Sequence, residues 1–229
     1  IPFDIHGGGA DLQFPHHENE IAQSCCAHNL ESYAKTWMHN GMLLVNGQKM
    51  SKSLGNFFTV RDKLAELPGE VIRAVLLSAH YRQSLDWTEE IVTQMQKFVD
   101  RLYQSLRGKV LDSHNDVSSE ILSALGDDLN TPLALRRLYD LSSEINTKGN
   151  PYLCRLLVNS ANLLGLLFQE PDQWFQKGAD SQHIENLMLQ RAKAKQEKNF
   201  AEADRIREQL KNMGIILEDG PQGTTWKRQ

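Results

Sequence analysis

The feature that most constrains the fold is a series of apolar side chains at helical spacing across residues 88–170. Thr88, followed by two glutamates, predicts a helix start, because such an N-cap and first turn suit free amides and the helix dipole. Two more starts are predicted where Thr131 precedes Pro132 and at Pro151, since proline fits a first helical turn. The apolar residues that recur are Ile91, Met95, Phe98, Leu102, Leu106, Leu135, Leu138, Leu141, Ile145, Leu156, Leu157, Leu163, Leu164 and Leu167. The spacing predicts a helical bundle with these side chains in its core.

The region before the bundle has a different texture. Residues 1–56 are rich in Gly and His and contain short apolar runs, which predicts a strand, a loop, a helix and a hairpin of an α/β domain. Asn46 and Gly47 follow one such run and favour the positive φ angles of a type I′ turn. Residues 57–87 predict two short connecting helices, the first of them opened by a capping box of Thr59 and Asp62.

The region after the bundle predicts a small separate domain at residues 183–229. The stretch EPDQWFQKGADSQ, residues 170–182, is polar and predicts a linker. A charged helical pattern follows, with a break expected near Asn199, and the chain closes on a predicted hairpin that contains Trp226.

Composition excludes several classes of protein. The net charge is −4, which argues against bulk nucleic-acid affinity while leaving room for a local basic patch. The longest apolar runs fall far short of the roughly 18 residues that span a bilayer, so we expect no membrane association. The three cysteines, Cys25, Cys26 and Cys154, predict no disulfide framework, and a cytoplasmic location fits best.

The segment NGQKMSKSLGN, residues 46–56, concentrates mobile positive charge after a tight turn. Lys49 and Lys52 suit the oxygens of a polyphosphate whose charge grows during a reaction, and Ser51 and Ser53 add neutral donors. We therefore interpret the segment as a mobile anion-binding loop. The alternative is a solvated basic turn, which is the commoner fate of a short loop rich in Lys and Ser.

The segment HGGGAD, residues 6–11, is the second candidate. Three consecutive glycines leave no Cβ between the backbone and a ligand, so a ring or a phosphate can approach the main chain. Asp11 could accept hydrogen bonds from ribose hydroxyls or from an amine. The alternative is a flexible loop.

The segment FPHHENE, residues 14–20, is the third. If a helix begins at Pro15, His16 and Glu20 stand four residues apart on one face, where they could share a divalent metal such as zinc. The alternative is a surface pair or a capped core histidine. Cys25 and Cys26 lie too far along the same helix to close this site, so we interpret them, like the bundle's third cysteine, as packing residues.

HGGGAD, FPHHENE and KMSKS, in this order within about 50 residues, resemble the catalytic domain of the cysteinyl-tRNA synthetases, a family of class I aminoacyl-tRNA synthetases. The resemblance continues through NFFTVRD, HYR at residues 80–82, DDLNTP at residues 127–132 and the ending EDGPQGTTW. It implies an α/β region followed by mostly α structure. Residues 1–56 would end a Rossmann-like catalytic domain, residues 57–87 would contact the tRNA stem, residues 88–170 would form a tRNA-binding bundle, and residues 183–229 would form a small α+β anticodon-binding domain.

The resemblance also implies site residues and ligands. Lys49 and Lys52 would be catalytic, and His6, Gly7, Gly8, Gly9, Asp11, Ser51 and Ser53 would complete the chain's share of the ATP site. ATP would enter with Mg²⁺, and L-cysteine and tRNA(Cys) would be the other substrates. His16 and Glu20 would be two of four ligands of one Zn²⁺ per subunit, with the two cysteine ligands upstream of Ile1.

Two further consequences concern the extent of the chain. The HIGH-like motif of class I synthetases is absent here, and the sequence opens without an initiator Met, so we infer a C-terminal half that is inactive by itself. We expect a monomer. Basic residues of the last helices could neutralise tRNA phosphates, and Trp226 could stack on an unpaired base, against the alternatives of a solvated helix face and a hairpin core.

Two other functions remain open from the sequence. A related ligase that joins cysteine to an amino sugar would share the three motifs, but it would have no reason to keep an anticodon-reading tail. A non-catalytic tRNA-binding module derived from such an enzyme fits the missing upstream half. The lysines and the metal-type residues count against the module.

Overall fold

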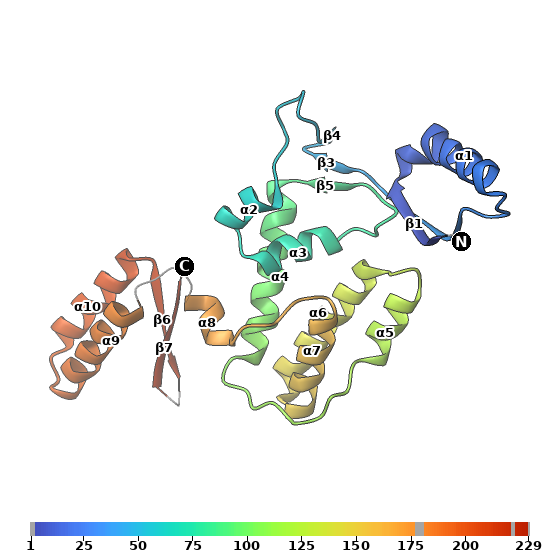
Figure 1. Cartoon of the computed structure of the whole chain (residues 1–229). Coiled ribbons are helices and arrows are strands. Elements are labelled where there is room, and N and C mark those ends of the chain that lie inside the picture. Colours follow the sequence, from blue (N-terminus) through green and yellow to red (C-terminus); the bar gives the residue numbers. More distant parts are fainter. Residues whose placement is uncertain (1–2, 177–180, 221–222, 229) are drawn as a thin grey trace. The chain divides into compact units, whose positions relative to one another are not determined.

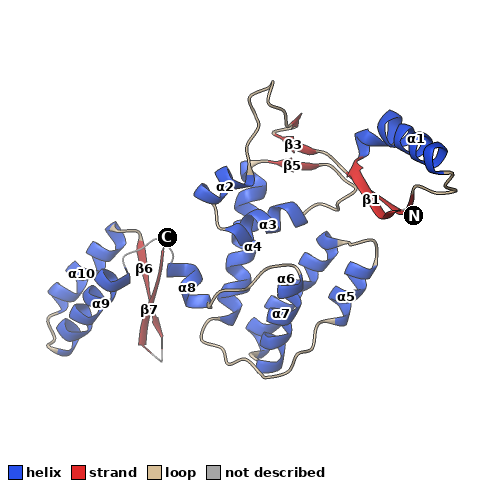
Figure 2. Ribbon diagram, viewed as in Figure 1, coloured by secondary structure: helices blue, strands red, loops and turns tan. Residues whose placement is uncertain are grey.

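A computed structural model of the chain describes residues 3–176, 181–220 and 223–228. The chain divides into two compact units, of which the first comprises residues 1–105 and 109–167, and the second residues 106–108 and 168–229. Helices make up most of the regular structure in both (Figures 1 and 2). Among the described residues, no helix has the length and apolar character needed to cross a membrane.

The first unit opens with a parallel pair of strands. Its elements are β1 (Phe3–Gly9), two irregular helical turns η1 (Ala10–Leu12) and η2 (Gln13–His17), α1 (Glu18–His28) and β2 (Ala34–Asn40). Parallel strands need a long crossover, and here α1 supplies it. In the register of this pair His6 lies opposite Trp37 and Gly8 opposite His39. The strand and the helix predicted for this region are confirmed, whereas β2 was not predicted as a separate strand.

A second small sheet holds the lysine-bearing segment. It consists of β3 (Leu43–Val45), β4 (Gln48–Lys49) and β5 (Leu85–Trp87), in the order β4-β3-β5, with β3 antiparallel to β4 and parallel to β5. Asn46 and Gly47 have φ angles of 50° and 77°, which confirms the predicted hairpin turn. Between β4 and β5 lie α2 (Val60–Glu66) and α3 (Gly69–Leu77), and the predicted capping box of Thr59 and Asp62 opens α2.

The bundle of the first unit has four helices where three were predicted. They are α4 (Glu89–Leu106), α5 (Ser119–Gly126), α6 (Thr131–Lys148) and α7 (Pro151–Leu163). The additional helix, α5, packs against α6 and is followed by the turn that leads into α6. The predicted cap at Thr131 was wrong by one residue, because the side chain of Asn130 accepts the Leu133 amide and Pro132 takes the second helical position.

Most predicted bundle-core residues are buried, along with several that the pattern did not single out. The buried apolar side chains of α3, α4, α6 and α7 are Val71, Ile72, Ala74, Val75, Met95, Val99, Leu102, Tyr103, Leu106, Ala134, Leu135, Leu138, Ile145, Cys154, Leu157 and Ala161. Cys154 is a core residue, as predicted. The prediction failed for Leu163, which is 51% exposed at the last position of α7. A helix end leaves room for an apolar side chain to turn outward, and spacing alone does not locate that end.

The second unit is a helical hairpin packed on a β-hairpin. Its elements are α8 (Pro171–Gln176), α9 (Ser181–Gln196), α10 (Phe200–Asn212), β6 (Ile215–Gly220) and β7 (Gly223–Arg228). Asn199 caps α10, which confirms the expected break, and β6 and β7 form the expected antiparallel pair. The core of this unit consists of Ile184, Leu187, Ile206, Leu210, Ile215 and Trp226. Because Trp226 is only 3% exposed, the idea that it stacks on an unpaired base was wrong.

The segment predicted as a linker contains a short helix. Within residues 170–182 the short helix α8 buries Trp174, while residues 177–180 lie outside the described residues. Residues 221–222 of the terminal hairpin lie outside them as well. Arg107 contributes to this second unit with a side chain that is 8% exposed, and its guanidinium lies 2.9 Å from Asp172 and 2.5 Å from Glu218.

Candidate active site

The glycine motif forms the end of β1. His6, Gly7, Gly8 and Gly9 occupy its last four positions, and Asp11 lies in the following turn. At Gly8 a Cβ atom would come within 3.0 Å of Cε1 of His17 and 3.1 Å of the Leu12 side chain. A side chain at Gly8 would therefore crowd His17 and Leu12, and its absence also suits a ligand.

The lysine loop, residues 49–56, is held from within by Asn56. The side chain of Asn56 accepts the amide of Ser51 at 2.9 Å and donates to the carbonyl of Lys49 at 3.3 Å. The hydroxyls of Ser51 and Ser53 lie 3.2 Å apart, and the ammonium of Lys52 lies 5.6 Å from the centre of the Phe57 ring. The loop thus has an ordered base and carries exposed polar side chains. Asn56 was not singled out from the sequence, although it closes the KSLGN segment.

The base of the loop reaches the glycine motif. Nζ of Lys49, on β4, lies 3.1 Å from Oδ2 of Asp11. This hydrogen bond lowers the pKa of the Asp11 carboxyl. Two of the three predicted motifs are therefore joined by a direct contact between their charged residues.

The third motif reaches the glycine motif through Glu20. Nε2 of His6 lies 3.0 Å from Oε2 of Glu20, and Nε2 of His16 lies 3.3 Å from Oε1. The helical spacing predicted for His16 and Glu20 thus brings their side chains together. Oε2 of Glu20 is buried and makes no hydrogen bond to any residue that the structure describes. An unsatisfied buried carboxylate oxygen between imidazoles is a feature that a bound cation would explain.

His17, which was not predicted as a site residue, also belongs to this group. Ligand atoms of His6, His17 and Glu20 all lie within 4.8 Å of one another. His17 is 3% exposed, and its Nδ1 lies 2.8 Å from Nε2 of His39 on β2, so its Nε2 is the nitrogen left for another partner. Burial and the neighbouring histidines lower the pKa of His17, which favours the neutral ring. The histidine doublet was a signal for His17, whereas nothing local pointed to His39.

The two cysteines of α1 do not join the group. Cys25 is half-buried and Cys26 is exposed near the end of the helix. The exclusion of both as ligands of the cluster agrees with the cluster's composition. The interpretation of Cys26 as a packing residue was wrong, because the helix turns that position outward.

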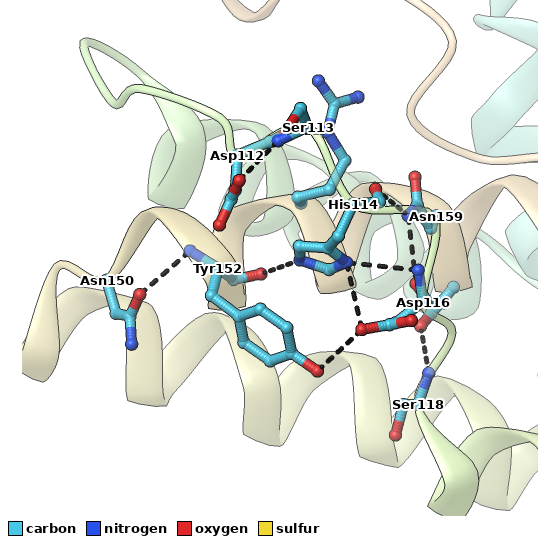
Figure 3. Close-up of polar contacts among 10 residues, drawn as sticks. Asp112, Ser113, His114, Asp116, Ser118, Asn150, Tyr152 and Asn159 are labelled. Carbon is cyan, nitrogen blue, oxygen red and sulfur yellow. Dashed lines mark hydrogen bonds and ion pairs between the residues drawn. The ribbon is translucent and has the colours of Figure 1, made fainter.

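A separate polar cluster lies in the bundle, between the loop that precedes α5 and the start of α7 (Figure 3). Nε2 of His114 donates to the Tyr152 carbonyl at 3.0 Å, and Nδ1 accepts the Asp116 amide at 3.1 Å. The Tyr152 ring stacks on His114 at 4.1 Å, and its hydroxyl donates to Asp116 at 3.2 Å. Both nitrogens of the His114 ring have partners, Nδ1 in the loop and Nε2 on α7, so the cluster fastens the loop to α7. It borders a cleft of about 640 Å³, whose Glu120 and Asp140 pair with Arg137.

Comparisons with known proteins cover nearly the whole chain. Residues 1–97 match the model for the tRNA synthetases class I (C) catalytic domain, residues 121–169 the DALR domain, and residues 180–226 the cysteinyl-tRNA ligase anticodon binding domain. Proteins named cysteine–tRNA ligase are 51% identical in Paramagnetospirillum magneticum, 53% in Rhodospirillum centenum and 46% in Vibrio cholerae, each over 99% of this chain. The chain belongs to the cysteinyl-tRNA synthetase family.

The chain spans about half the length of these relatives, 52% in each of the three. Among solved structures, it resembles the LeuRS of Agrobacterium radiobacter K84, crystallised as a LeuRS-tRNA-LeuAMS ternary complex. The match has a TM-score of 0.53 and 18% identity, and it covers 72% of this chain and 25% of the other. That likeness concerns the fold, and it agrees with the predicted class I synthetase architecture. All three motifs of the site lie within the part of the chain that matches the class I catalytic model.

Proposed function

We propose that the protein to which this chain belongs activates L-cysteine with ATP and transfers it to tRNA(Cys). The observation that carries the proposal is the contact between Lys49 and Asp11, which joins the KMSKS loop to the glycine strand in a chain of this family. A basic turn that only faced solvent would not be expected to contact the HGGGAD segment. The contact supports one site built from both segments.

The roles of the residues follow from the reaction. The cysteine carboxylate attacks the α-phosphorus of ATP, and pyrophosphate leaves with additional negative charge. Lys49 and Lys52 would stabilise that charge, and the hydroxyls of Ser51 and Ser53 would donate further hydrogen bonds to it. Mg²⁺ would accompany the nucleotide. The loop is exposed and is hinged between Gly47 and Gly55, both at positive φ, which suits closure over ATP and reopening for release.

The glycine strand would hold the adenylate. The backbone of Gly7, Gly8 and Gly9 offers a surface with no side chains of its own, beside His6 and Asp11. Asp11 would accept hydrogen bonds from ribose hydroxyls once Lys49 turns toward phosphate. The ribose hydroxyls and Lys49 would thus compete for one carboxylate, so binding of the nucleoside would favour release of Lys49.

His16 and Glu20 would hold a zinc ion. The donor set fits, because imidazole and carboxylate are ordinary zinc ligands and the buried Oε2 of Glu20 lacks a hydrogen bond. His6 and His17 lie beside the same carboxylate and form the alternative donor set. The missing ligands of a four-coordinate site would come from outside this chain. When bound, the ion would coordinate the substrate thiolate and so separate cysteine from serine, which an apolar pocket distinguishes poorly.

The bundle and the second unit would bind tRNA. Lys193, Arg205 and Lys211 of α9 and α10 have exposed side chains, although each also pairs with a glutamate of its own helix, whereas Arg191 is buried. The exposed ones suit phosphate contacts. An anticodon-type unit at the end of the chain also disfavours the amino-sugar ligase, which needs no such unit.

The test uses the complete gene product and two assays. ATP–pyrophosphate exchange that depends on cysteine would support the enzyme, and its absence would favour a non-catalytic tRNA-binding module. Transfer of the activated cysteine to tRNA(Cys), compared with transfer to an amino sugar, separates the two ligases. Exchange with serine at the rate seen with cysteine would contradict the role given to zinc.

A further inference from the structure

The turn between α5 and α6 carries a carboxylate with an unusual number of partners. Oδ1 of Asp128 accepts the hydroxyl of Tyr81 at 2.7 Å and Nη2 of Arg82 at 3.3 Å, and Oδ2 accepts Nε of Arg82 at 2.6 Å. Asp128 has a φ of 49°, a left-handed conformation that is uncommon for residues other than glycine. The bundle therefore holds the segment between α3 and β5 through charge-assisted hydrogen bonds to both oxygens of one carboxylate, a contact called the grip of Asp128 below.

The gripped segment, residues 80–84, is also fixed on its other side, where it meets the end of β2. The amide of Gly41 donates to the Tyr81 carbonyl at 2.7 Å. A Cβ atom at Gly41 would lie only 2.2 Å from the Gln83 carbonyl oxygen, so the two backbones are too close to admit any side chain at this position. A segment held this tightly on one side transmits a displacement imposed on the other.

The same segment leads directly into β5, which supports the base of the lysine loop. The amide of Leu85 donates to the Met42 carbonyl at 3.0 Å, which starts the pairing of β5 beside β3. Both oxygens of Asp86 then accept the amide of Gly47 at 3.0 Å. Gly47 belongs to the turn that precedes Lys49, so a carboxylate of β5 fixes the point from which the loop departs.

We propose that Asp128 is a positioning residue for the lysine loop, acting through Tyr81 and Arg82 on β5 and through Asp86 on the turn at Gly47. The catalytic consequence of this role rests on the function proposed above, whereas its structural consequence does not. The chain of contacts makes the α5–α6 turn of the bundle a support of the phosphate-binding loop. Loss of the Asp128 contacts would leave every residue of the loop in place in the sequence but would shift the loop in space. Such a shift lowers the reaction rate where charged groups must be positioned accurately against a transition state.

The structural consequence is tested by hydrogen exchange of the complete gene product, followed by mass spectrometry of peptides that span residues 42–50. Asp128→Asn keeps the size of the side chain and removes its charge, and exchange there is expected to become roughly 2- to 30-fold faster. Arg82→Gln removes two of the three hydrogen bonds from the opposite side and should have the same effect. Glu120→Gln is the matched control, because it removes a 3.2 Å ion pair with Arg137 between the same two helices. Unchanged exchange at residues 42–50 in both Asp128→Asn and Arg82→Gln would overturn the proposal.

The catalytic consequence is tested by pyrophosphate exchange. We expect Asp128→Asn to lower kcat roughly 2- to 30-fold with the KM for cysteine unchanged, and Glu120→Gln to leave both unchanged. Asp86→Asn should also lower kcat, and the double variant should be no slower than the slower single variant, because both act on one turn. Multiplicative effects, or an unchanged kcat in Asp128→Asn, would refute the positioning role. If the unsubstituted protein showed no ATP–pyrophosphate exchange, the proposed function would be refuted. The hydrogen-exchange measurement of residues 42–50 would still decide the structural claim.

Discussion

Lys49 and Asp11 are 38 residues apart in the chain and form an ion pair, with Nζ of the lysine 3.1 Å from Oδ2 of the aspartate. The contact places the start of the lysine loop beside the end of the glycine strand. Both side chains are about half exposed, so the pair is weak and open to competition from a ligand. A weak pair of this kind suits the proposed role of Lys49, in which its ammonium turns from Asp11 toward a phosphate.

Lys52 is expected to be needed for chemistry and unnecessary for folding. Lys52→Ala in the complete gene product should reduce cysteine-dependent pyrophosphate exchange on the order of 10²-fold, because one donor to the developing charge is lost. Its exposed position predicts a change in unfolding free energy within about 0.5 kcal/mol. Lys35→Ala is the matched control, since Lys35 is an exposed lysine of β2 paired with Asp4. Equal rates in the two variants would contradict the role of Lys52.

Metal content should separate the two candidate ligand sets. We expect Glu20→Ala and His16→Ala to lower the zinc bound to the complete gene product, as measured by inductively coupled plasma mass spectrometry after dialysis. His17→Gln should retain the metal, because His17 lies outside the proposed pair. Zinc that persists in His16→Ala and disappears in His17→Gln would assign the site to His6, His17 and Glu20 instead. Zinc unchanged in all three variants would reject the site.

The grip of Asp128 should persist to low pH. Its hydrogen bonds to Arg82 and Tyr81 hold the pKa of the carboxyl at about 2, below its ordinary value of 3.8. Because the folded-state pKa is depressed, the stabilisation is complete above the ordinary value and is lost as the pH falls through about 2. A carbon-13 NMR titration of the Asp128 carboxyl should show a midpoint near 2, and Tyr81→Phe should raise it. A midpoint near 3.8 in the unsubstituted protein would show that the contacts do not form in solution.

The core of the second unit should be sensitive to truncation. Leu210 is fully buried among Ile184, Ile206 and Trp226, so Leu210→Ala is expected to cost about 2–5 kcal/mol of unfolding free energy in that unit. Leu189→Ala, on the neighbouring helix at 69% exposure, should cost less than about 0.5 kcal/mol. Urea unfolding followed by hydrogen exchange of peptides from residues 184–217 measures both. Equal costs would mean that this core is not packed as described.

Local features were predictable because their causes lie within a few residues. The turn at Asn46 and Gly47, the capping box at Thr59 and the break at Asn199 each depend on side chains that act on the adjacent backbone. Helical spacing likewise indicated most of the bundle core. It could not separate α5 from the helices around it, because that short helix lies in a segment where no apolar stripe was recognised.

Contacts between distant segments were not predictable in the same way. The pairing of Lys49 with Asp11, of His17 with His39, and of Asp128 with Tyr81 and Arg82 depends on how strands and turns pack against each other. Spacing along the chain carries no information about such distances.

The amino-acid sequence by itself determined the family, the three motifs and the residue types suited to phosphate and metal. Only the tertiary structure decided that Glu20 lies between two histidines, that Trp226 is buried, and that a carboxylate of the bundle reaches the support of the lysine loop. The physical reason is that propensity and capping act over one or two turns of chain, whereas burial and charge pairing depend on which surfaces the folded chain brings together.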